Sequence, residues 1–375
     1  MIIKGQDEVT DAVVAVMERT ADPRLREIMM SLVRHLHGFV RDVRLTEAEF
    51  QAATAILNRM GQLTTDSHNE MVLMAGTLGV SSLVCLLNNG DNGTTETSQS
   101  LLGPFWRLNS PRVENGGTII RSKTSGPAMF MRAQVLNRQG EPVVGAEVDI
   151  WHSSPVGLYE NQDPTQENMN LRGKFTTDAE GRFWFRSVKP TGYPIPTHGV
   201  VGELLAVQSR HPFRPAHVHA LIFKEGYKTL ISQIYADDDP NLETDVAFGV
   251  TQVLVARYER HDELHPTEPN AGTPWYSLDY TFVMEPGVAT LPRPLIKWSR
   301  LYWTQAYTFE GERLITLWLL PPARLSKHPL RAVTDQVDPD HLGLCRSCHQ
   351  RFSATHLCTS QIMKRPTGFR RNGTS

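Results

Sequence analysis

Two histidines, His217 and His219, stand one residue apart in the segment Arg214-Pro215-Ala216-His217-Val218-His219. The apolar residues that follow, as far as Phe223, favour a strand over 217–223. In a strand, side chains at i and i+2 point to the same face, so the two imidazoles would be aimed at one point. Paired imidazoles suit a transition metal such as iron, zinc or copper. Two ordinary surface histidines on one face of a strand fit the same pattern, so the pair alone leaves the choice open.

Two tyrosines are candidate partners for this pair because of the loops in which they lie. Tyr159 follows a predicted strand, in a loop with Pro155 and Gly157, and Tyr193 lies in Lys189-Pro190-Thr191-Gly192-Tyr193-Pro194-Ile195-Pro196. Proline fixes the backbone φ angle, so the second loop holds its tyrosine in one direction. Most tyrosines are core or rim aromatics. A phenol, whose pKa is about 10, becomes a phenolate ligand only beside a strong Lewis acid, so two tyrosine ligands would indicate ferric iron.

The elements that must position these side chains lie between about residues 101 and 297. This region is punctuated by glycine and proline, and short strand-like segments recur between the turns. The predicted strands are 129–136, 146–151, 181–186, 204–208, 217–223, 230–235, 251–256 and 280–284. Short strands separated by turn signals, without interleaved helices, predict an antiparallel sandwich or barrel.

The residues before about 90 have helical periodicity. An apolar stripe runs from Val9 to Met17, and Asp22-Pro23 is typical of a helix start. Thr46-Glu47-Ala48-Glu49 and Ser67-His68-Asn69-Glu70 both fit a capping box, which opens a helix. We expect four helices, the last ending near Asn88, that form a small helical domain. Apolar stripes left over after internal packing could serve dimerisation.

The composition excludes several classes of protein. The chain has 375 residues, of which 40% are hydrophobic and 21% charged, and its net charge of -2 does not call for nucleic acid or a membrane as partner. No apolar run has the length of a transmembrane helix, and the N-terminus has no signal-peptide pattern. Four cysteines, three of them near the end, do not make a disulfide framework. We therefore expect a cytoplasmic location.

Several motifs together resemble those of the intradiol ring-cleaving dioxygenases, the group of catechol and hydroxyquinol 1,2-dioxygenases. They are Leu102-Gly103-Pro104-Phe105, Asp149-Ile150-Trp151-His152, Gly157-Leu158-Tyr159, Gly181-Arg182-Phe183-Trp184-Phe185-Arg186, Gly192-Tyr193 and Arg214-Pro215-Ala216-His217-Val218-His219. The resemblance extends over residues 1–297. It implies a mixed α and β fold, with an N-terminal helical linker and dimerisation domain over 1–100 and an antiparallel β-sandwich catalytic domain over 101–297. It also implies a homodimer formed through the N-terminal helices, with a lipid as a further candidate ligand there.

The resemblance further implies a non-haem Fe(III) cofactor and assigns roles to individual residues. The four metal ligands would be Tyr159, Tyr193, His217 and His219. Tyr193, released from the metal, would take up a substrate proton, Arg214 would stabilise negative charge on the ring, and Gln233 would orient an oxygen atom of an intermediate. The positions that would line the substrate pocket are Leu73, Gly76, Leu101, Leu102, Gly103, Pro104, Phe105, Ile195, Pro196, Arg214 and Ala247.

The loops around these positions are most similar to those of hydroxyquinol 1,2-dioxygenases. The indicative segments are Tyr159-Glu160-Asn161-Gln162-Asp163-Pro164, Asn170-Leu171-Arg172-Gly173, Tyr193-Pro194-Ile195-Pro196-Thr197 and Val201-Gly202-Glu203-Leu204-Leu205. We expect hydroxyquinol (1,2,4-trihydroxybenzene) and O2 as substrates, with maleylacetate (3-hydroxy-cis,cis-muconate) as product. Gly76 departs from the acidic residue that hydroxyquinol enzymes tend to carry there, so catechol or a chlorocatechol, giving a cis,cis-muconate, stays an alternative. A non-catalytic β-sandwich binding module is the alternative of a different class.

Residues 298–375 form a C-terminal extension to which no role is assigned. Cys345-Arg346-Ser347-Cys348-His349 matches a c-type haem pattern, but that attachment requires export. Cys345, Cys348, His356 and Cys358 could instead bind zinc, although the second pair has an unusual spacing.

Overall fold

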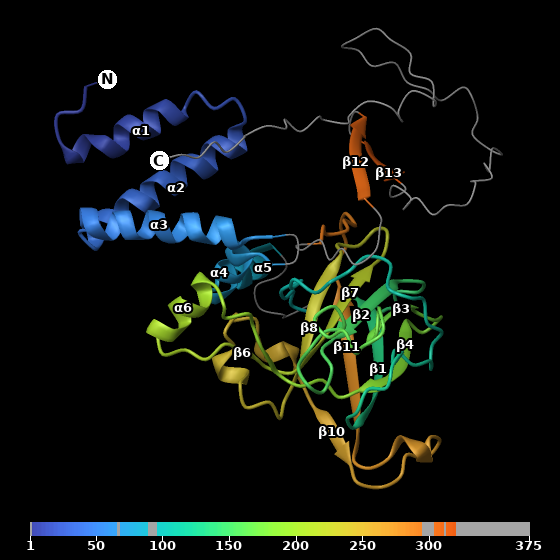
Figure 1. Cartoon of the computed structure of the whole chain (residues 1–375). Coiled ribbons are helices and arrows are strands. Elements are labelled where there is room, and N and C mark those ends of the chain that lie inside the picture. The colour runs from blue at the N-terminus through green and yellow to red at the C-terminus, as the bar shows by residue number, and fades with distance from the viewer. Residues whose placement is uncertain (1, 66–67, 89–95, 295–303, 311–312, 320–375) are drawn as a thin grey trace, which may run out of the picture. The chain divides into compact units, whose positions relative to one another are not determined.

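The computed structural model describes residues 2–65, 68–88, 96–294, 304–310 and 313–319 (Figure 1). The chain divides into two compact units, Met1–Leu301 and Tyr302–Ser375. In the second unit the described residues form an antiparallel pair, β12 (Thr304–Glu310) and β13 (Arg313–Leu319). The cysteine and histidine motifs of the tail lie outside the described residues.

The N-terminal segment, as far as it is described, contains five α-helices instead of the four expected, after a short 3-10 turn over Gln6–Glu8. They are α1 (Val9–Met17), α2 (Pro23–Asp42), α3 (Glu47–Leu63), α4 (Glu70–Thr77) and α5 (Val80–Asn88). The start signals at Asp22 and Thr46 are confirmed, because Asp22 accepts a hydrogen bond from the Leu25 amide and Thr46 forms the predicted capping box with Glu49. The capping box predicted at 67–70 is wrong. Asn69 caps α4 by accepting from the Val72 amide, and Ser67 lies outside the described residues.

The extra helix arises from a sharp break between α4 and α5, whose axes differ by 75°. Gly79 lies at the break with φ +72, a left-handed conformation that favours glycine. A Cβ there would also lie 3.6 Å from the ring of Phe248. Among the described helices, none is by itself long and apolar enough to cross a membrane; only α4 and α5 taken together have a suitable length and composition.

The strands that follow form two main sheets. One has the order β10-β11-β1-β4 and the other the order β3-β2-β7-β8-β9, and a short ribbon pairs β5 with β6. Their bounds are β1 (Ala128–Asn137), β2 (Glu147–His152), β3 (Arg172–Thr176), β4 (Arg182–Val188), β5 (Tyr193–Pro194), β6 (Phe213–Arg214), β7 (His217–Phe223), β8 (Leu230–Ala236), β9 (Val255–Ala256), β10 (Tyr258–His261) and β11 (Trp275–Met284). Most pairings are antiparallel, whereas β1 with β11 and β8 with β9 are parallel.

The main hydrophobic core lies between the two sheets. Met131 of β1 and Phe282 of β11 belong to the same buried cluster as Ile150 of β2 and Ala220 of β7. This confirms the predicted fold class, a helical N-terminal segment followed by a β-sandwich.

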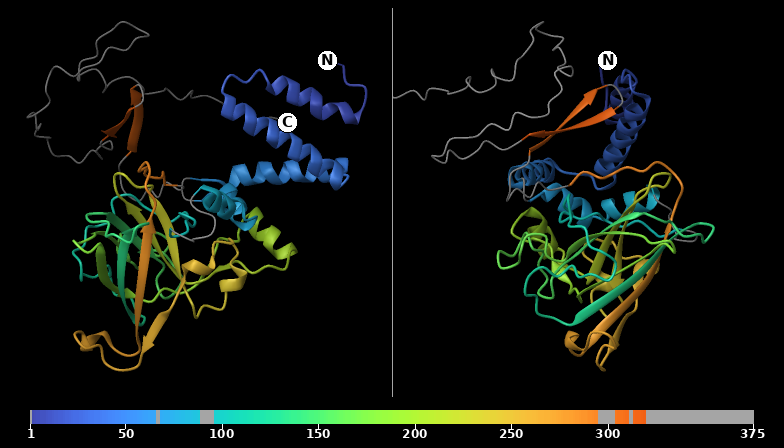
Figure 2. Two further views of the ribbon diagram at one scale, coloured as in Figure 1. Left: turned by 180° about the vertical axis from the view of Figure 1, so that it is seen from behind. Right: turned by 90° about the vertical axis from the view of Figure 1, so that its right-hand side faces the viewer.

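Two predicted strands are corrected by the structure. Residues 204–207 belong to a helix, α6 (Val200–Val207), which Gln208 caps and which lies beside α4 (Figures 1 and 2). A short apolar run does not distinguish strand from helix, and here Val201 and Leu205, four residues apart, are buried on one helix face. Of the predicted strand 251–256, only β9 is a strand, after a 3-10 turn over Gln252–Leu254. Strands β3 and β10 were not predicted, because β3 contains Gly173 and Lys174 and β10 is a four-residue edge strand.

Candidate metal centre and its surroundings

The histidine pair lies on the face of β7 that is turned away from the sandwich core. Val218, Ala220 and Ile222 enter the core. His217 and His219 occupy the opposite face, as the two-residue period requires. Both are 1% exposed, and their Nε2 atoms lie 3.1 Å apart. The predicted strand and the predicted convergence of the two imidazoles are therefore both present.

Neighbouring groups fix the orientation of each imidazole. His217 Nδ1 lies 2.7 Å from the carbonyl oxygen of Pro215, and because a carbonyl can only accept, Nδ1 carries the proton and Nε2 has a free lone pair. Trp151 of β2, which is directly opposite His219 in the sheet, stacks on the His219 ring at 4.4 Å and 9°. Nδ1 of His219 has no hydrogen-bond partner.

Tyr159 and Tyr193 converge on the same place from two loops that touch at a glycine. Gly157 has φ +78, and a Cβ on it would lie 3.2 Å from both the Gly192 oxygen and Tyr193 Cβ, so the two loops approach each other too closely for a side chain. The two phenol rings lie 5.4 Å apart, and the Tyr193 ring lies 5.6 Å from that of His217. Tyr159 is 1% exposed and Tyr193 3%. The four predicted ligands thus form one buried cluster.

Burial keeps all four groups neutral in the absence of a cation. Desolvation raises the pKa of both phenols, that of Tyr159 well above 10 with a further contribution from the neighbouring Tyr193. It lowers the pKa of His217 to about 3 and that of His219 well below 6.5. The Tyr159 hydroxyl makes no hydrogen bond of good geometry. A buried cation would give these donors a partner, and two hard phenolates with two imidazoles fit Fe(III).

The part of the chain that the structure describes contains no group of three or more His, Cys, Asp or Glu that could hold a metal. The candidate centre is therefore one that depends on its tyrosines.

Arg214 and Gln233 are linked through Tyr235, which lies on β8 two residues after Gln233. Arg214 Nη2 donates to Tyr235 Oη (2.8 Å), and Tyr235 Oη donates to Gln233 Oε1 (2.6 Å). Gln233 Nε2 in turn donates to the carbonyl of Leu101. The side chain of Asp245 forms an ion pair with Arg214 on its other side. The predicted catalytic pair thus belongs to one buried hydrogen-bonded chain.

The predicted pocket residues fall into two groups. Phe105 stacks on Tyr159 with ring centroids 4.3 Å apart, Leu102 packs in the same cluster, and a Cβ on Gly103 would lie 3.3 Å from the His219 ring. Pro104 precedes Phe105 in the chain, and Leu101 accepts from Gln233. In the second group, Leu73 packs against the buried cluster to which Ile195 belongs, and a Cβ on Gly76 would be 3.9 Å from Ala247 Cβ. Pro196 follows Ile195 and is half-buried.

Four residues close to the centre were missed from the sequence: Glu160, Arg172, Tyr235 and Asp245. Tyr235 could have been found, because it shares a strand face with Gln233 at a spacing of two. Glu160 and Asp245 carry no local signal, since their arginine partners, Arg172 and Arg214, lie 12 and 31 residues away in the chain. Their roles depend on tertiary contacts.

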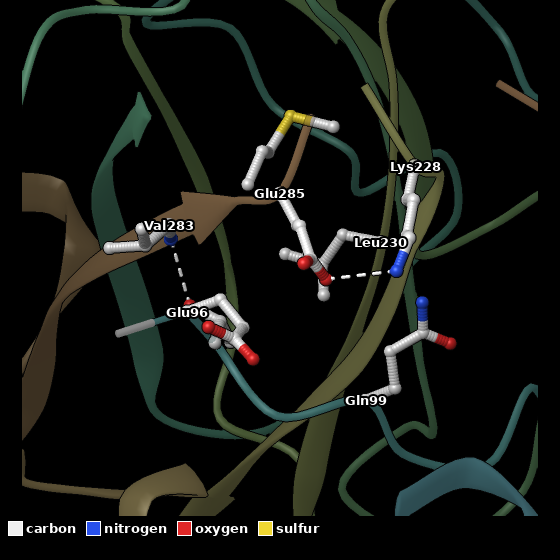
Figure 3. Close-up of a pocket in the computed structure, with 8 residues that line it drawn as sticks. Glu96, Gln99, Lys228, Leu230, Val283 and Glu285 are labelled. Atoms are coloured by element: carbon white, nitrogen blue, oxygen red, sulfur yellow. Dashed lines mark hydrogen bonds and ion pairs between the residues drawn. The ribbon is translucent and has the colours of Figure 1, made fainter. Parts of the chain in front are cut away.

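Two cavities in the first unit lie away from the candidate centre. One, of about 10 Å³, lies between Gln99, Lys228 and Glu285, where Lys228 reaches Glu285 at 3.1 Å (Figure 3). That volume is at the lower limit for one water molecule. A wider depression of about 350 Å³ lies over the outer face of the four-stranded sheet, beside Arg132 and Trp184. Neither cavity is lined by a residue predicted to act in the site.

Comparisons with known proteins agree with the geometry. A family described as catechol dioxygenase N terminus matches residues 22–95, and a family described as dioxygenase matches residues 102–286. A hydroxyquinol 1,2-dioxygenase from a Rhizobium species is 37% identical over 283 residues, which are 74% of this chain and 95% of that protein. A catechol 1,2-dioxygenase from Candida albicans is 35% identical over 72% of this chain and 89% of its own length.

A solved structure shares the fold as well as the sequence. The hydroxyquinol 1,2-dioxygenase from Pseudomonas putida DLL-E4 superposes with a TM-score of 0.69 at 38% identity, covering 75% of this chain and 99% of its own. With both halves of the described unit matched and the site residues gathered in one cluster, the chain belongs to the intradiol ring-cleavage dioxygenases.

Proposed function

We propose that the chain is a non-haem Fe(III) hydroxyquinol 1,2-dioxygenase that converts hydroxyquinol and O2 to maleylacetate. The observation that carries this proposal is the burial of Tyr159, Tyr193, His217 and His219 around one point, three of them 1% exposed and Tyr193 3%. These four residues would hold the iron. When bound, Fe(III) supplies the Lewis acidity that draws electron density from a bound aromatic diol.

Tyr193 is the phenol we assign to proton transfer. Burial raises the pKa of its hydroxyl, and the charge of Arg214, the residue opposite it in the β5–β6 ribbon, offsets part of that rise. As a metal ligand Tyr193 would be a phenolate, and only this deprotonated form can accept a proton from a substrate hydroxyl. In this role Tyr193 Oη takes up that proton and later returns it.

Arg214 and Gln233 would act on the ring and on oxygen. Arg214 is buried and keeps its charge, so it stabilises negative charge that develops on the substrate. The amide of Gln233 uses one hydrogen to reach Leu101, which leaves its second N–H to donate to an oxygen of the substrate.

Hydroxyquinol is favoured over catechol by the sequence of the loops around Tyr159 and Tyr193, and the similarity to a protein named hydroxyquinol 1,2-dioxygenase supports this choice. Gly76 argues in the other direction, since it offers no acidic group to a third hydroxyl. Side-by-side turnover of hydroxyquinol, catechol and chlorocatechols, followed through the muconate product, tests the choice. Faster turnover of catechol than of hydroxyquinol would overturn it.

The colour of the purified protein tests the ferric centre. Phenolate-to-Fe(III) charge transfer gives a band in the visible range, so we expect a coloured protein with one iron per chain. A folded but colourless and iron-free chain would instead support a non-catalytic β-sandwich binding module.

A homodimer formed through the helices is part of the proposal. Leu25, Ile28, Leu32 and Leu36 follow one face of α2 at spacings of three and four residues, and each is about half exposed in the single chain. A second chain, with or without a lipid, would cover this face. Analytical ultracentrifugation of the wild type and of Leu32→Glu tests this: a monomeric wild type would contradict it.

A further inference from the structure

The guanidinium of Arg214 is held by a buried carboxylate that the reaction itself does not require. Asp245 Oδ1 accepts from Arg214 Nε (3.1 Å), and Asp245 Oδ2 accepts from Arg214 Nη2 (3.0 Å). The side chains of Arg214 and Asp245 are 5% and 2% exposed. A two-point contact between two planar groups fixes both the position and the plane of the guanidinium. Nη2 also donates to Tyr235, so both Nε and Nη2 of the guanidinium are held by buried partners.

Asp245 is itself fixed by the backbone that follows it. Its carboxylate accepts from the amides of Ala247 (3.2 Å) and Gly249 (2.8 Å), so it closes the loop 245–249 on itself. Gly249 has no room for a side chain, because a Cβ would lie 2.6 Å from Arg214 Nη2 and 2.7 Å from Tyr235 Oη. Burial would raise the pKa of Asp245, but Arg214 and these amides outweigh that effect and lower it. The carboxylate is therefore ionised, and each of its oxygens accepts one hydrogen bond from Arg214 and one from a loop amide.

The same loop is held from outside by the N-terminal helices. Ser82 of α5 donates to the Ala247 carbonyl (2.9 Å). Arg210 donates to the Thr77 carbonyl at the end of α4 (2.8 Å) and to the Val246 carbonyl (3.0 Å). Phe248, at φ +53, packs over Gly79 at the break between the two helices. The helices thus contact the residues that follow Asp245, directly at Ala247 and Phe248 and through Arg210 at Val246.

We propose that Asp245 is a positioning residue that fixes the Arg214 guanidinium, and that α4 and α5 keep Asp245 in place through the loop 245–249. The inference rests on the proposed function, in which Arg214 acts on the bound ring. It adds that the helical segment, beyond any part in dimerisation, contributes to the geometry of the catalytic arginine.

The first test is Asp245→Asn in the full-length, iron-loaded protein. Asparagine keeps the shape and one acceptor but removes the charge and the two-point contact. We expect kcat to fall by about 10- to 100-fold, the range for losing a group that orients an active one. The charge-transfer band, the iron content and the affinity for catechol measured without oxygen should stay as in the wild type.

The matched control is Asp279→Asn. Asp279 binds Arg132 through the same two-point geometry, at 2.9 and 2.9 Å, but on the surface, where the side chains of Arg132 and Asp279 are 71% and 60% exposed. The kcat of Asp279→Asn should equal that of the wild type. If Asp245→Asn retained wild-type kcat, or if Asp279→Asn lost as much, Asp245 would have no positioning role.

A double-mutant cycle separates positioning from general damage. In the Arg214→Ala background, Asp245→Asn should cause no further loss of kcat, because its effect passes through Arg214. Independent, multiplicative losses would contradict the proposal. The same cycle measured on thermal unfolding of the metal-free protein should also be non-additive, which gives a readout that needs neither iron nor turnover.

Ser82→Ala tests the contribution of the helices and serves if Asp245→Asn does not fold. Loss of one neutral hydrogen bond to the loop should lower kcat by about two- to tenfold. Ser81→Ala, one residue earlier on α5, is the control and should be neutral. If Ser82→Ala kept the wild-type kcat, the helices would have no part in positioning Arg214. A wild type without colour or turnover would instead refute the proposed function itself.

Discussion

The loops that carry Tyr159 and Tyr193 are held in different ways. Behind Tyr159, the buried carboxylate of Glu160 accepts from Arg107 (2.6 Å) and from Arg172 (2.8 Å). Tyr193 lies in a two-residue strand paired with Phe213–Arg214, beside an exposed Pro194 and a Phe213 that is 40% exposed. The Tyr159 loop is thus anchored by buried charges, whereas the Tyr193 loop, whose Pro194 and Phe213 are exposed, is held by backbone pairing. We expect Tyr159 to stay fixed during turnover and Tyr193 to be the phenol that moves.

The largest effect should come from removing the two hydroxyls separately. Tyr159→Phe deletes the anchored donor, so iron affinity should fall by more than the roughly 100-fold seen for residues that only support a ligand. Tyr193→Phe should lose turnover while retaining iron, since three donors remain and the clamped loop is intact. Iron content and the charge-transfer band measure both. Equal iron loss in the two variants would contradict the prediction that Tyr159 is the fixed ligand and Tyr193 the one that moves.

Breaking the clamp should come next. Glu160→Gln leaves Arg172, which is 1% exposed, without a counter-charge, and the free energy of unfolding should fall by about 3–5 kcal/mol. The control, Glu268→Gln, breaks a 2.6 Å contact with Arg186 between half-exposed groups and should cost no more than about 1 kcal/mol. Urea unfolding measures both. A small cost at Glu160 would mean that the clamp does not anchor Tyr159.

Acid should lower the stability of the protein through His152, which lies where the Tyr159 and Tyr193 loops meet. His152 Nδ1 donates to the Ser153 carbonyl, and Ser153 Oγ donates to the Thr191 carbonyl in the Tyr193 loop. Burial lowers the pKa of His152 from 6.5 to about 4, so between these values the unfolded chain binds the extra proton. This contribution to stability is complete above pH 6.5 and is lost as the pH falls towards 4.

The size of the pH effect follows from that shift. At about 1.4 kcal/mol for each pKa unit, the loss is on the order of 3 kcal/mol. The free energy of unfolding in urea is measured at each pH for the wild type and for His152→Gln. The difference between the two proteins separates the contribution of His152 from that of other titrating groups. Parallel pH profiles for the two proteins would show that His152 does not contribute.

The smallest effect concerns the contact of the two loops at Gly157. Gly157→Ala places a Cβ 3.2 Å from the Gly192 oxygen in a left-handed conformation, which should cost about 1–3 kcal/mol. Gly140→Ala has the same φ of +78 but nothing within 4 Å of the added Cβ, so it measures the conformational cost alone. A shifted charge-transfer band only in Gly157→Ala would show that crowding reaches the phenols.

The parts of the site that could be predicted from the sequence are those governed by local geometry. The strand 217–223 and the position of its two histidines on one face follow from a period of two. That Tyr159 and Tyr193 lie beside these histidines was predicted from the family resemblance alone. The local sequence of a loop does not determine which distant residues its side chains will meet. Asp245 was not predicted, since its loop has no periodicity and its contact with Arg214 spans 31 residues.

The fold shows the same division. The start of α3 at Thr46 was predicted because a capping box is a contact between residues three apart. The helix over 200–207 was not, because its short apolar run is equally compatible with a strand and its burial against Leu73 and Met74 is tertiary. The same limit applies to the break at Gly79, where the neighbouring Phe248 ring comes from a loop 169 residues further along the chain.

The two faces of β7 have a consequence for how such a chain can change in length. Successive residues of this strand alternate between the sandwich core and the donor cluster, so one inserted or deleted residue within 217–223 would send valine and isoleucine to the centre and both imidazoles into the core. A single substitution in this strand changes one side chain, whereas an insertion or deletion changes the face of every residue that follows it in the strand. Gains and losses of residues in this family should therefore be confined to turns such as the one at Gly140, where the backbone has open space around it.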